Sequence, residues 1–431
     1  MAERSGGAAP HWLAAMPGGA GAGVGRRRGP TRLVVLGLLI AAGCVSYIDR
    51  TALAVSTVEI GREFGLSYTD LGLLLSSFAT VYMLCQIPAG LVADRVRARR
   101  LLLFSLLVWS AAQILSAFST GMGGLLAARG LLAIGEAPIF LAGTRVIALW
   151  FDRGRRAMPI GLFNASSALG QVLAPALLGG IAVQFGWRAM FGVVGCTSLV
   201  LAVIWAWVYR DPRTVAAGRG ETRPRPRSPK EIRFLLSHRS SWALAGGFVG
   251  VVYLQWLYAA WLPTYLQTAR HAAAARADYL SSLPQLAGFL GGLGGGVVSE
   301  VLGRIGWPAA RACRVPLVAA LFVAAAATIL APLCPAMVLS LVAMSVALFA
   351  AGIAMTCGWT LGTVLIDDGS IATLEAIQNM GGSLGGAIAP VLTGAITQRT
   401  GSFTMAMVVA GLVAALSGII YWVGTGRRIE A

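Results

Sequence analysis

The chain has 431 residues, of which 57% are hydrophobic and only 12% are charged, and its mean hydropathy is +0.75. Charged residues make up about a quarter of an ordinary soluble domain, so this composition excludes a soluble protein. Hydrophobic runs of about 20 residues, the length of helix that crosses the hydrocarbon core of a bilayer, recur along the chain. The sequence therefore predicts an all-α membrane protein.

Short polar breaks separate the hydrophobic runs into twelve predicted membrane-spanning helices. Their approximate ranges are 33–58, 69–93, 100–119, 122–149, 158–184, 188–209, 240–268, 279–302, 313–332, 334–357, 371–397 and 403–424. The longest break is rich in Arg and Pro and divides these helices into two sets of six. We therefore expect a disordered tail over 1–32, a six-helix bundle over 33–209, a basic linker over 210–239, a second six-helix bundle over 240–424 and a short tail over 425–431.

The net charge of +17 would by itself suggest a nucleic-acid partner, so the placement of the charges matters. Most of the 34 Lys and Arg residues lie in the N-terminal tail and in every second connection between the predicted helices. This bias is typical of cytoplasmic loops. The basic charge therefore orients the chain, with both termini and the linker in the cytoplasm, and no nucleic-acid partner is expected.

Residue types that carry catalysis or bind metals show no useful spacing in this chain. The six cysteines lie in or beside hydrophobic runs, where they are typical small core residues, and the three histidines lie in polar segments. The sequence contains no metal-ligand pattern, no phosphate-binding glycine loop and no nucleophile with a base nearby. We therefore expect neither an enzyme nor a bound cofactor or metal.

The two halves of the chain resemble each other. The segment "GLFNASSALGQVLAPALLGGI" in the fifth predicted helix matches "AIQNMGGSLGGAIAPVLTGAI" in the eleventh, with Asn164 opposite Asn379 and Pro175 opposite Pro390. Helices in the same order in both halves indicate a parallel repeat about an axis along the membrane normal. Such repeats place a substrate site near the bilayer midplane, between two bundles that rock against each other.

Four charged residues fall inside otherwise hydrophobic helices. Asp49 and Arg50 lie in "SYIDRTALAV", and Arg129 and Glu136 lie two helical turns apart in "ARGLLAIGEAPIF". A charge at the bilayer centre costs on the order of 2.5–3.5 kcal/mol, so such residues usually face a cavity and have a partner. An arginine can bind a carboxylate through its planar fork, and a buried acid can carry a proton. The set predicts a site that binds an anion and takes up a proton, although a purely structural salt bridge between the first and fourth helices remains an alternative.

Other polar and aromatic side chains are weaker candidates. Seven of them lie within the hydrophobic runs and either line the site or pack between helices: Tyr47, Tyr82, Trp256, Tyr258, Trp261, Trp359 and Asn379. The charged loop "DRVRARR" after the second helix contains Asp94, Arg95 and Arg99. These residues either latch the two halves in one state or act only as orientation signals.

Taken together, the motifs resemble the major facilitator superfamily and, more narrowly, its anion:cation symporter family. The resemblance rests on the twelve spans, on "YIDRTALAV", "GLVADRVRARR" and "RGLLAIGEAP" in the first half, and on "WLPTYL" and "IQNMGGSLGGAIAPVLTG" in the second. It implies the major facilitator fold, with two pseudo-symmetric six-helix bundles. It also implies a secondary active transporter that carries an organic anion, a sugar acid or another small carboxylate, by proton-coupled symport and alternating access.

The resemblance also implies roles for individual residues. Asp49 and Glu136 are implied to couple transport to protons, and six side chains are implied to bind substrate: Arg50, Arg129, Tyr47, Tyr82, Trp359 and Asn379. Asp94, Arg95 and Arg99 belong to the implied conformational latch. By our alignment, Ser167 and Phe248 occupy two positions where galactonate-type members use glutamine, which weakens an assignment to galactonate and leaves room for less hydroxylated or aromatic acids.

The expected surroundings follow from this assignment. We expect a multi-pass protein of the bacterial inner membrane that acts as a monomer on a small organic anion and protons. One alternative is a proton-coupled antiporter that exports lipophilic compounds, but arginines in the cavity disfavour cationic cargo. The other is a membrane sensor that binds a ligand without transporting it, which would need a structured tail or linker. Neither the N-terminal tail nor the linker shows the pattern of a structured domain.

Overall fold

The computed structural model describes residues 32–151, 157–210, 229–366 and 371–425. Regular structure in these residues is helical throughout. The N-terminal half contains α2 (Arg32–Phe64), α3 (Tyr68–Arg95), α4 (Ala98–Ala117), α5 (Met122–Glu136), α6 (Ile139–Trp150) and α7 (Ala157–Val208). The C-terminal half contains α10 (Arg239–Thr268), α11 (Ala274–Arg304), α12 (Ala309–Leu330), the 3-10 helix η2 (Ala331–Leu333), α13 (Met337–Val364), α14 (Ile371–Thr400) and α15 (Phe403–Gly424).

Eleven helical segments of the described chain are long and hydrophobic enough to cross a membrane, with α5 and α6 counted as one. Among them, α7 has 52 residues, which is far longer than the ~20 residues that one crossing requires. The helical conformation breaks at Gly186, where φ is 81° and ψ is 162°. Only glycine adopts this backbone conformation readily, so it separates α7 into two arms. The described residues thus contain eleven hydrophobic segments when α7 is counted once and twelve when its arms are counted separately, so the number of twelve spans stays a prediction.

The fourth predicted helix is also interrupted, at a point that bears on the site. α5 ends at Glu136 and α6 begins at Ile139, with Pro138 between them. Proline has no backbone N–H to donate to the preceding turn and its ring clashes with that turn, so it ends or kinks a helix. Glu136 therefore lies at the end of a helix, where neighbouring elements can approach its carboxylate.

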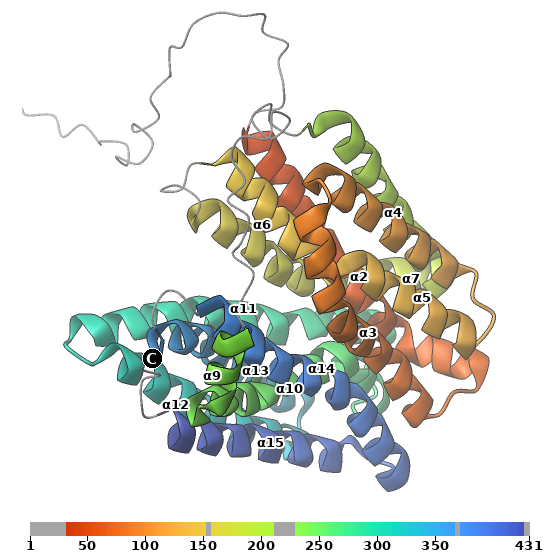
Figure 1. Ribbon diagram of the computed structural model, residues 1–431. Coiled ribbons are helices and arrows are strands. Elements are labelled where there is room, and N and C mark those ends of the chain that lie inside the picture. The colour runs from red at the N-terminus through yellow and green to blue at the C-terminus, as the bar shows by residue number, and fades with distance from the viewer. Residues whose placement is uncertain (1–31, 152–156, 211–228, 367–370, 426–431) are drawn as a thin grey trace, which may run out of the picture.

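Figure 1 shows the two halves as separate groups of helices, the first coloured red to yellow-green and the second green to blue, with α3 of the first beside α14 of the second. The halves also meet where α7 packs on α11 and where α2 packs on α10. These pairings bring together the second and eleventh, the fifth and eighth, and the first and seventh predicted helices. They are the pairings that a parallel two-fold repeat produces.

The contact between α3 and α14 closes one end of the space between the halves. Near the start of α3, Gly72 lies so close to α14 that an added Cβ would be 2.8 Å from the carbonyl oxygen of Pro390. The backbone N–H of Tyr68 donates to Oε1 of Gln398 at 3.0 Å, and the hydroxyl of Ser76 donates to the carbonyl oxygen of Ala387. This end of the bundle is opposite the end at which α2 begins and α15 ends, because α3 starts where α2 ends and α15 starts where α14 ends.

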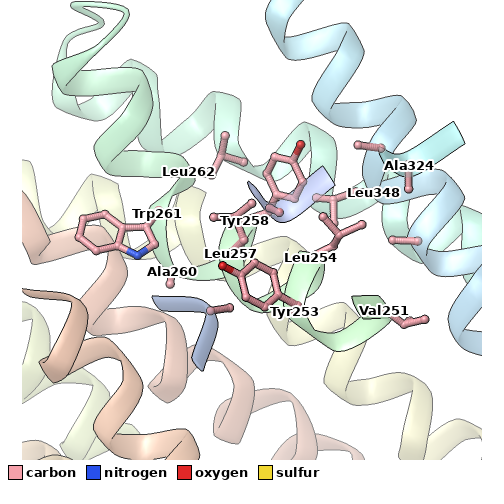
Figure 2. Close-up of a cluster of buried hydrophobic side chains, with 14 of the residues drawn as sticks. Val251, Tyr253, Leu254, Leu257, Tyr258, Ala260, Trp261, Leu262, Ala324 and Leu348 are labelled. Carbon is pink, nitrogen blue, oxygen red and sulfur yellow. The ribbon is translucent and has the colours of Figure 1, made fainter. Parts of the chain in front are cut away.

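The core of the C-terminal half forms around α10. Figure 2 shows its side chains, among them Tyr253, Leu254, Leu257 and Tyr258, packed together with side chains of other helices such as Leu348 of α13. One buried hydroxyl of this core, that of Tyr258, donates to the Thr328 hydroxyl of α12 at 3.1 Å. This packing holds α10 in place as one wall of the space between the halves.

The predicted tails and linker fall largely outside the described residues. The N-terminal tail is represented only by Arg32, the first residue of α2, and the C-terminal tail only by Thr425. Within the described part of the linker the structure contains one short helix, α9 (Pro229–Ser237). Proline is favoured in the first turn of a helix, and Leu235 is fully buried, which stabilises this short helix.

Candidate functional site

A cavity of about 590 Å³ lies between the two halves. Side chains of α2, α3, α5 and α7 form one wall, and side chains of α10, α11, α13 and α14 form the other. Its size is within the range of small-molecule sites. Its position between the repeats is where the sequence predicts the substrate.

Arg50 and Glu136 form a buried ion pair beside the cavity. The Arg50 Nε donates to Oε2 of Glu136 at 2.6 Å, and the side chains are 11% and 0% exposed, respectively. The hydroxyl of Ser46 donates to the same carboxylate oxygen at 2.9 Å. The other carboxylate oxygen of Glu136 and the Nη2 of Arg50 are buried without a hydrogen-bond partner. The pair therefore keeps one acceptor and one strong donor unused.

Asp49 lies behind the cavity wall and does not line the cavity. Its side chain is fully buried, and Oδ2 accepts a hydrogen bond from the Ser198 hydroxyl of α7 at 3.1 Å. Gln113 of α4 donates to the backbone carbonyl of Asp49 at 3.0 Å. Oδ1 has no partner, and among the described residues Asp49 forms no ion pair. The geometry leaves a carboxyl group that can hold a proton without losing a salt bridge.

Arg129 supplies the second charge of the cavity wall. It is only 2% exposed, and its Nη1 donates to the backbone carbonyl of Arg50 at the long distance of 3.4 Å. Its Nε is buried without a partner. A guanidinium is a weakly hydrated cation that favours planar, bidentate recognition of carboxylates. Arg50 and Arg129 thus both line the cavity, and each has one buried donor without a hydrogen-bond partner.

Aromatic rings surround the Arg50 guanidinium. Its Cζ lies 4.5 Å from the ring centre of Tyr47, 4.7 Å from that of Tyr82 and 4.8 Å from that of Phe78. A cation is attracted to the electron-rich face of an aromatic ring, most strongly where water is excluded. The rings therefore help to keep a charged arginine inside the membrane.

The opposite wall of the cavity contains no charged side chain among the described residues. It consists of aromatic, small and uncharged polar side chains, including Phe248, Trp256, Trp359 and Asn379. The rings of Phe248 and Trp359 meet edge to face, with centres 5.1 Å apart. The charges of the cavity therefore come entirely from the N-terminal half.

The structure places the predicted substrate-binding residues around one cavity. All six of them line it: Tyr47, Arg50, Tyr82, Arg129, Trp359 and Asn379. Of the weaker candidates, Trp256 also lines the cavity, whereas Tyr258 and Trp261 are buried in the core of the C-terminal half. The individual roles of the six residues stay predictions.

Several functional contacts were not predicted from the sequence. Ser46, Gln113 and Ser198 bind the two acids, and Phe78 contacts both arginines. One signal was present, because Phe78 and Tyr82 are four residues apart and therefore share a face of α3. Single serines and phenylalanines in hydrophobic helices are otherwise indistinguishable from packing residues.

The predicted latch is only partly described. The side chains of Asp94 and Arg95 lie outside the described residues. Arg99 donates from Nη2 to the carbonyl oxygen of Ala206 at 2.7 Å, which is a contact within the N-terminal half. In the described part of the chain, no three His, Cys, Asp or Glu side chains converge on a metal position.

Comparison with known proteins identifies the family. The family model described as the Major Facilitator Superfamily matches residues 39–374, which is more than half of the chain. The chain belongs to the major facilitator superfamily. Together with its hydrophobic helices, this makes it a multi-pass membrane protein of a transporter superfamily.

Curated relatives of this superfamily protein include carriers named for sugar acids. The chain is 33% identical to a probable L-galactonate transporter of Escherichia coli (strain K12), with 89% of this chain and 87% of the relative aligned. It is 28% identical to a D-galactonate transporter of Escherichia coli O6:H1, over 93% of this chain and 97% of the relative. It is 29% identical to a hexuronate transporter of Bacillus subtilis (strain 168), over 90% of this chain and 93% of the relative. These relatives confirm the predicted narrower family, that of anion:cation symporters.

A solved structure confirms the predicted fold. A bacterial homologue of the human lysosomal transporter Spinster, in an inward-facing and unoccupied conformation, matches with a TM-score of 0.76 at 20% identity. The match covers 93% of this chain and 98% of that chain. At this identity the likeness concerns the fold alone.

Proposed function

We propose that this protein is a secondary active transporter that carries an organic anion, a sugar acid or another small carboxylate, by proton-coupled symport. The observation that carries the proposal is the cavity between the halves, where the charged side chains among the described lining residues are Arg50 and Arg129. The buried Nη2 of Arg50 and Nε of Arg129 lack partners. A buried donor without a partner is unfavourable by about 1–3 kcal/mol, so a carboxylate that accepts these hydrogen bonds is strongly favoured. The names of the relatives support sugar acids as cargo.

In this proposal, proton coupling arises because Glu136 and the substrate carboxylate compete for the Arg50 guanidinium. Glu136 now holds the Arg50 guanidinium through Nε. A substrate carboxylate that binds the same guanidinium weakens this ion pair, and a buried carboxylate without a cation is stabilised by accepting a proton. Asp49, which has no ion-pair partner among the described residues, supplies a second position for a proton behind the wall. Substrate and proton then cross together.

Alternating access is supported by the way the halves meet. The contacts around Gly72 and Ser76 of α3 close the cavity at one end, and rocking about the substrate would open that end and close the other. In this proposal twelve segments cross a bacterial inner membrane, both termini are cytoplasmic, and the chain works as a monomer. Asp94 and Arg95 at the end of α3 and Arg99 at the start of α4 then belong to the latch on the cytoplasmic side.

The two alternatives have less support from the site. An exporter of lipophilic cations would need acidic side chains in the cavity, but the described lining contains arginines as its charged groups. A sensor that does not transport its ligand would not need two halves that enclose a cavity and contact each other through glycines such as Gly72 and Gly394. The symporter is therefore the proposal that accounts for both the arginines of the cavity and the close contacts between the halves.

The test is uptake into proteoliposomes that contain the purified protein. Labelled D-galactonate, L-galactonate and glucuronate are offered with an inward proton gradient, and unlabelled aromatic acids, dicarboxylates and lipophilic cations are added as competitors. We expect accumulation of a carboxylate that needs the gradient and is abolished by Arg50→Ala, but not by Arg62→Ala, a matched change at an exposed position of the same helix. Transport of lipophilic cations without transport of any carboxylate would overturn the proposal in favour of the exporter. Binding without flux would favour the sensor.

A further inference from the structure

Phe78 of α3 is the aromatic residue that contacts both arginines of the cavity. Its ring centre lies 4.8 Å from Cζ of Arg50 and 5.2 Å from Cζ of Arg129. The side chain is fully buried and does not itself line the cavity. It therefore supports the two cations from behind and makes no direct contact with anything in the cavity.

One aromatic ring can stabilise two neighbouring positive charges. Two guanidiniums close together repel each other, and the repulsion is large where water is excluded. The face of an aromatic ring carries negative potential, so the Phe78 ring attracts both cations and offsets part of their repulsion. Tyr82, one turn further along α3, stacks on Phe78 with ring centres 5.5 Å apart and an interplanar angle of 21°. The orientation of the Phe78 ring is thus restrained from one side.

Trp256 of α10 restrains the ring from the other half of the protein. Its ring stacks on Phe78 with centres 6.2 Å apart and an interplanar angle of 25°. The indole also lies against α14, because a Cβ added at Gly386 would be 2.8 Å from its Cδ1 and Nε1 atoms. Trp256 therefore occupies the position where α3, α10 and α14 meet.

This meeting point adjoins the contact that closes the cavity. Ser76, two residues before Phe78, donates a hydrogen bond to the carbonyl oxygen of Ala387, the residue after Gly386. When α3 and α14 separate at this point, the stack between Phe78 and Trp256 must open as well. The placement of the arginines and the closure between the halves thus share one aromatic contact.

We propose that Phe78 is a positioning residue: its ring holds Arg50 and Arg129 in place for the substrate carboxylate and, through Trp256, links their placement to the closed contact between α3 and α14. The part about substrate rests on the proposed function, in which the arginines bind the carboxylate. A link of this kind gives the two conformations different affinities for the anion, which is what a carrier needs to couple binding to rocking.

The first experiment changes the electrostatics of the ring and keeps its shape. 3,4,5-Trifluorophenylalanine at position 78 weakens the negative face, and uptake of D- and L-galactonate is then measured in proteoliposomes over a range of pH. We expect KM to rise by about tenfold, with the maximal rate changed much less, because a buried cation–π contact is strong enough for a change of this size. Phe78→Leu should show the same defect, and Phe78→Tyr should retain near-native KM. The matched control is the same fluorinated residue at Phe163 of α7, which is equally buried in the N-terminal half, packs against Phe140, does not line the cavity and has no cation–π contact among the described residues; it should keep native KM. A fluorinated Phe78 protein with native KM and native pH profile would overturn the positioning role.

The second experiment needs no substrate. Spin labels are placed at two exposed positions on the closed side, Arg62→Cys at the end of α2 and Thr400→Cys at the end of α14, after the native cysteines have been replaced. We expect Phe78→Leu and Trp256→Ala to shift the distances measured by electron paramagnetic resonance toward longer values, and Trp256→Phe to leave them unchanged. Trp205→Ala is the control, because this buried tryptophan of α7 stacks on Tyr209 and does not line the cavity; the distances should stay unchanged in it.

The transport experiment and the distance experiment together distinguish a failure of the proposed function from a failure of this inference. If the native protein takes up neither galactonate, the proposed cargo is wrong, and the distance measurement alone judges the link to the closed contact. A shift in that measurement supports the link. Unchanged distances in both Phe78→Leu and Trp256→Ala overturn it, whatever the transport assay shows.

Discussion

Asp49 and Arg50 are adjacent in the sequence, yet their side chains leave α2 toward different surroundings. Arg50 reaches the cavity and pairs with Glu136 at 2.6 Å, whereas Asp49 accepts a hydrogen bond from Ser198 at 3.1 Å behind the wall. Successive residues on a helix point about 100° apart, since one turn takes 3.6 residues. The two charges can therefore serve different tasks, one toward the anion and one toward the proton.

Asp49→Asn should uncouple transport from the proton gradient. The amide keeps the shape of the carboxyl and can still accept from Ser198, but it cannot bind and release a proton. We expect proton-driven accumulation of galactonate to fall to the level of empty vesicles, while exchange of labelled for unlabelled substrate persists. The matched control is Asp278→Asn, another buried acid, which lies on α11 against Gly179 of α7 and outside the cavity lining. Full accumulation by Asp49→Asn would show that this carboxyl is not needed for coupling.

Gly72→Val should prevent the closed contact from forming. A Cβ at this position would lie 2.8 Å from the Pro390 carbonyl oxygen and 3.0 Å from Cα of Val391, and backbone atoms cannot move aside as a flexible side chain can. We expect uptake to fall by at least about tenfold, because overpacking of this kind typically costs about 1–3 kcal/mol. Gly90→Ala on the same helix, where nothing lies within 4 Å, should transport normally. Native uptake by Gly72→Val would contradict a close approach of α3 and α14 during the cycle.

Gly186→Ala should lower stability without touching the cavity. The residue has φ of 81° and ψ of 162° with nothing within 4 Å, so the strain comes from the backbone alone. Residues held in such sparsely populated conformations cost about 1–3 kcal/mol. We expect a lower melting temperature in detergent, measured by intrinsic fluorescence. Gly192→Ala has equally open surroundings but a helical backbone, and it should be neutral or slightly stabilising.

Phe248→Gln should shift the preference of the cavity toward hydroxylated acids. Phe248 is 1% exposed and packs edge to face on Trp359, at a position where the family resemblance implies glutamine in galactonate-type members. An amide there can hydrogen-bond substrate hydroxyl groups, whereas the native ring can only make apolar contacts. We expect D-galactonate to compete about tenfold better, relative to benzoate, than in the native protein, as a change in pocket contacts of this size permits. An unchanged ratio of the two inhibition constants would show that this position does not select the cargo.

Most of the fold could be predicted because a helix that crosses the bilayer must be a hydrophobic run of about 20 residues. The run 403–424, for example, coincides with α15 (Phe403–Gly424). The end of α2 was predicted less well, because the polar segment after residue 58 remains helical to Phe64. There, Glu63 accepts hydrogen bonds from Trp187 and Arg188, which are more than a hundred residues away. Such tertiary partners override the local signal of a polar loop.

Only the charged part of the candidate site stands out on physical grounds; the uncharged Tyr47, Tyr82, Trp359 and Asn379, which also line the cavity, were singled out by the family resemblance. Asp49, Arg50, Arg129 and Glu136 stand out because charges are rare and expensive inside a membrane helix. Phe78 does not stand out, because its contact with the arginines depends on how α2, α3 and α5 pack and has no counterpart in spacing along the chain. The division of the site into a charged and an uncharged wall likewise required the structure.

That division has a consequence for how carriers of this kind can diversify. The groups proposed to handle the proton and the carboxylate all belong to the N-terminal bundle, and the described wall of the C-terminal bundle contributes shape and neutral hydrogen-bonding groups. On the proposed function, substitutions in α10, α13 or α14 would therefore change which acid is accepted and leave the proton-handling residues untouched. The two halves resemble each other in sequence, yet the proposed mechanism gives them different tasks: the N-terminal bundle holds the charges, and the C-terminal bundle sets the shape of the cargo.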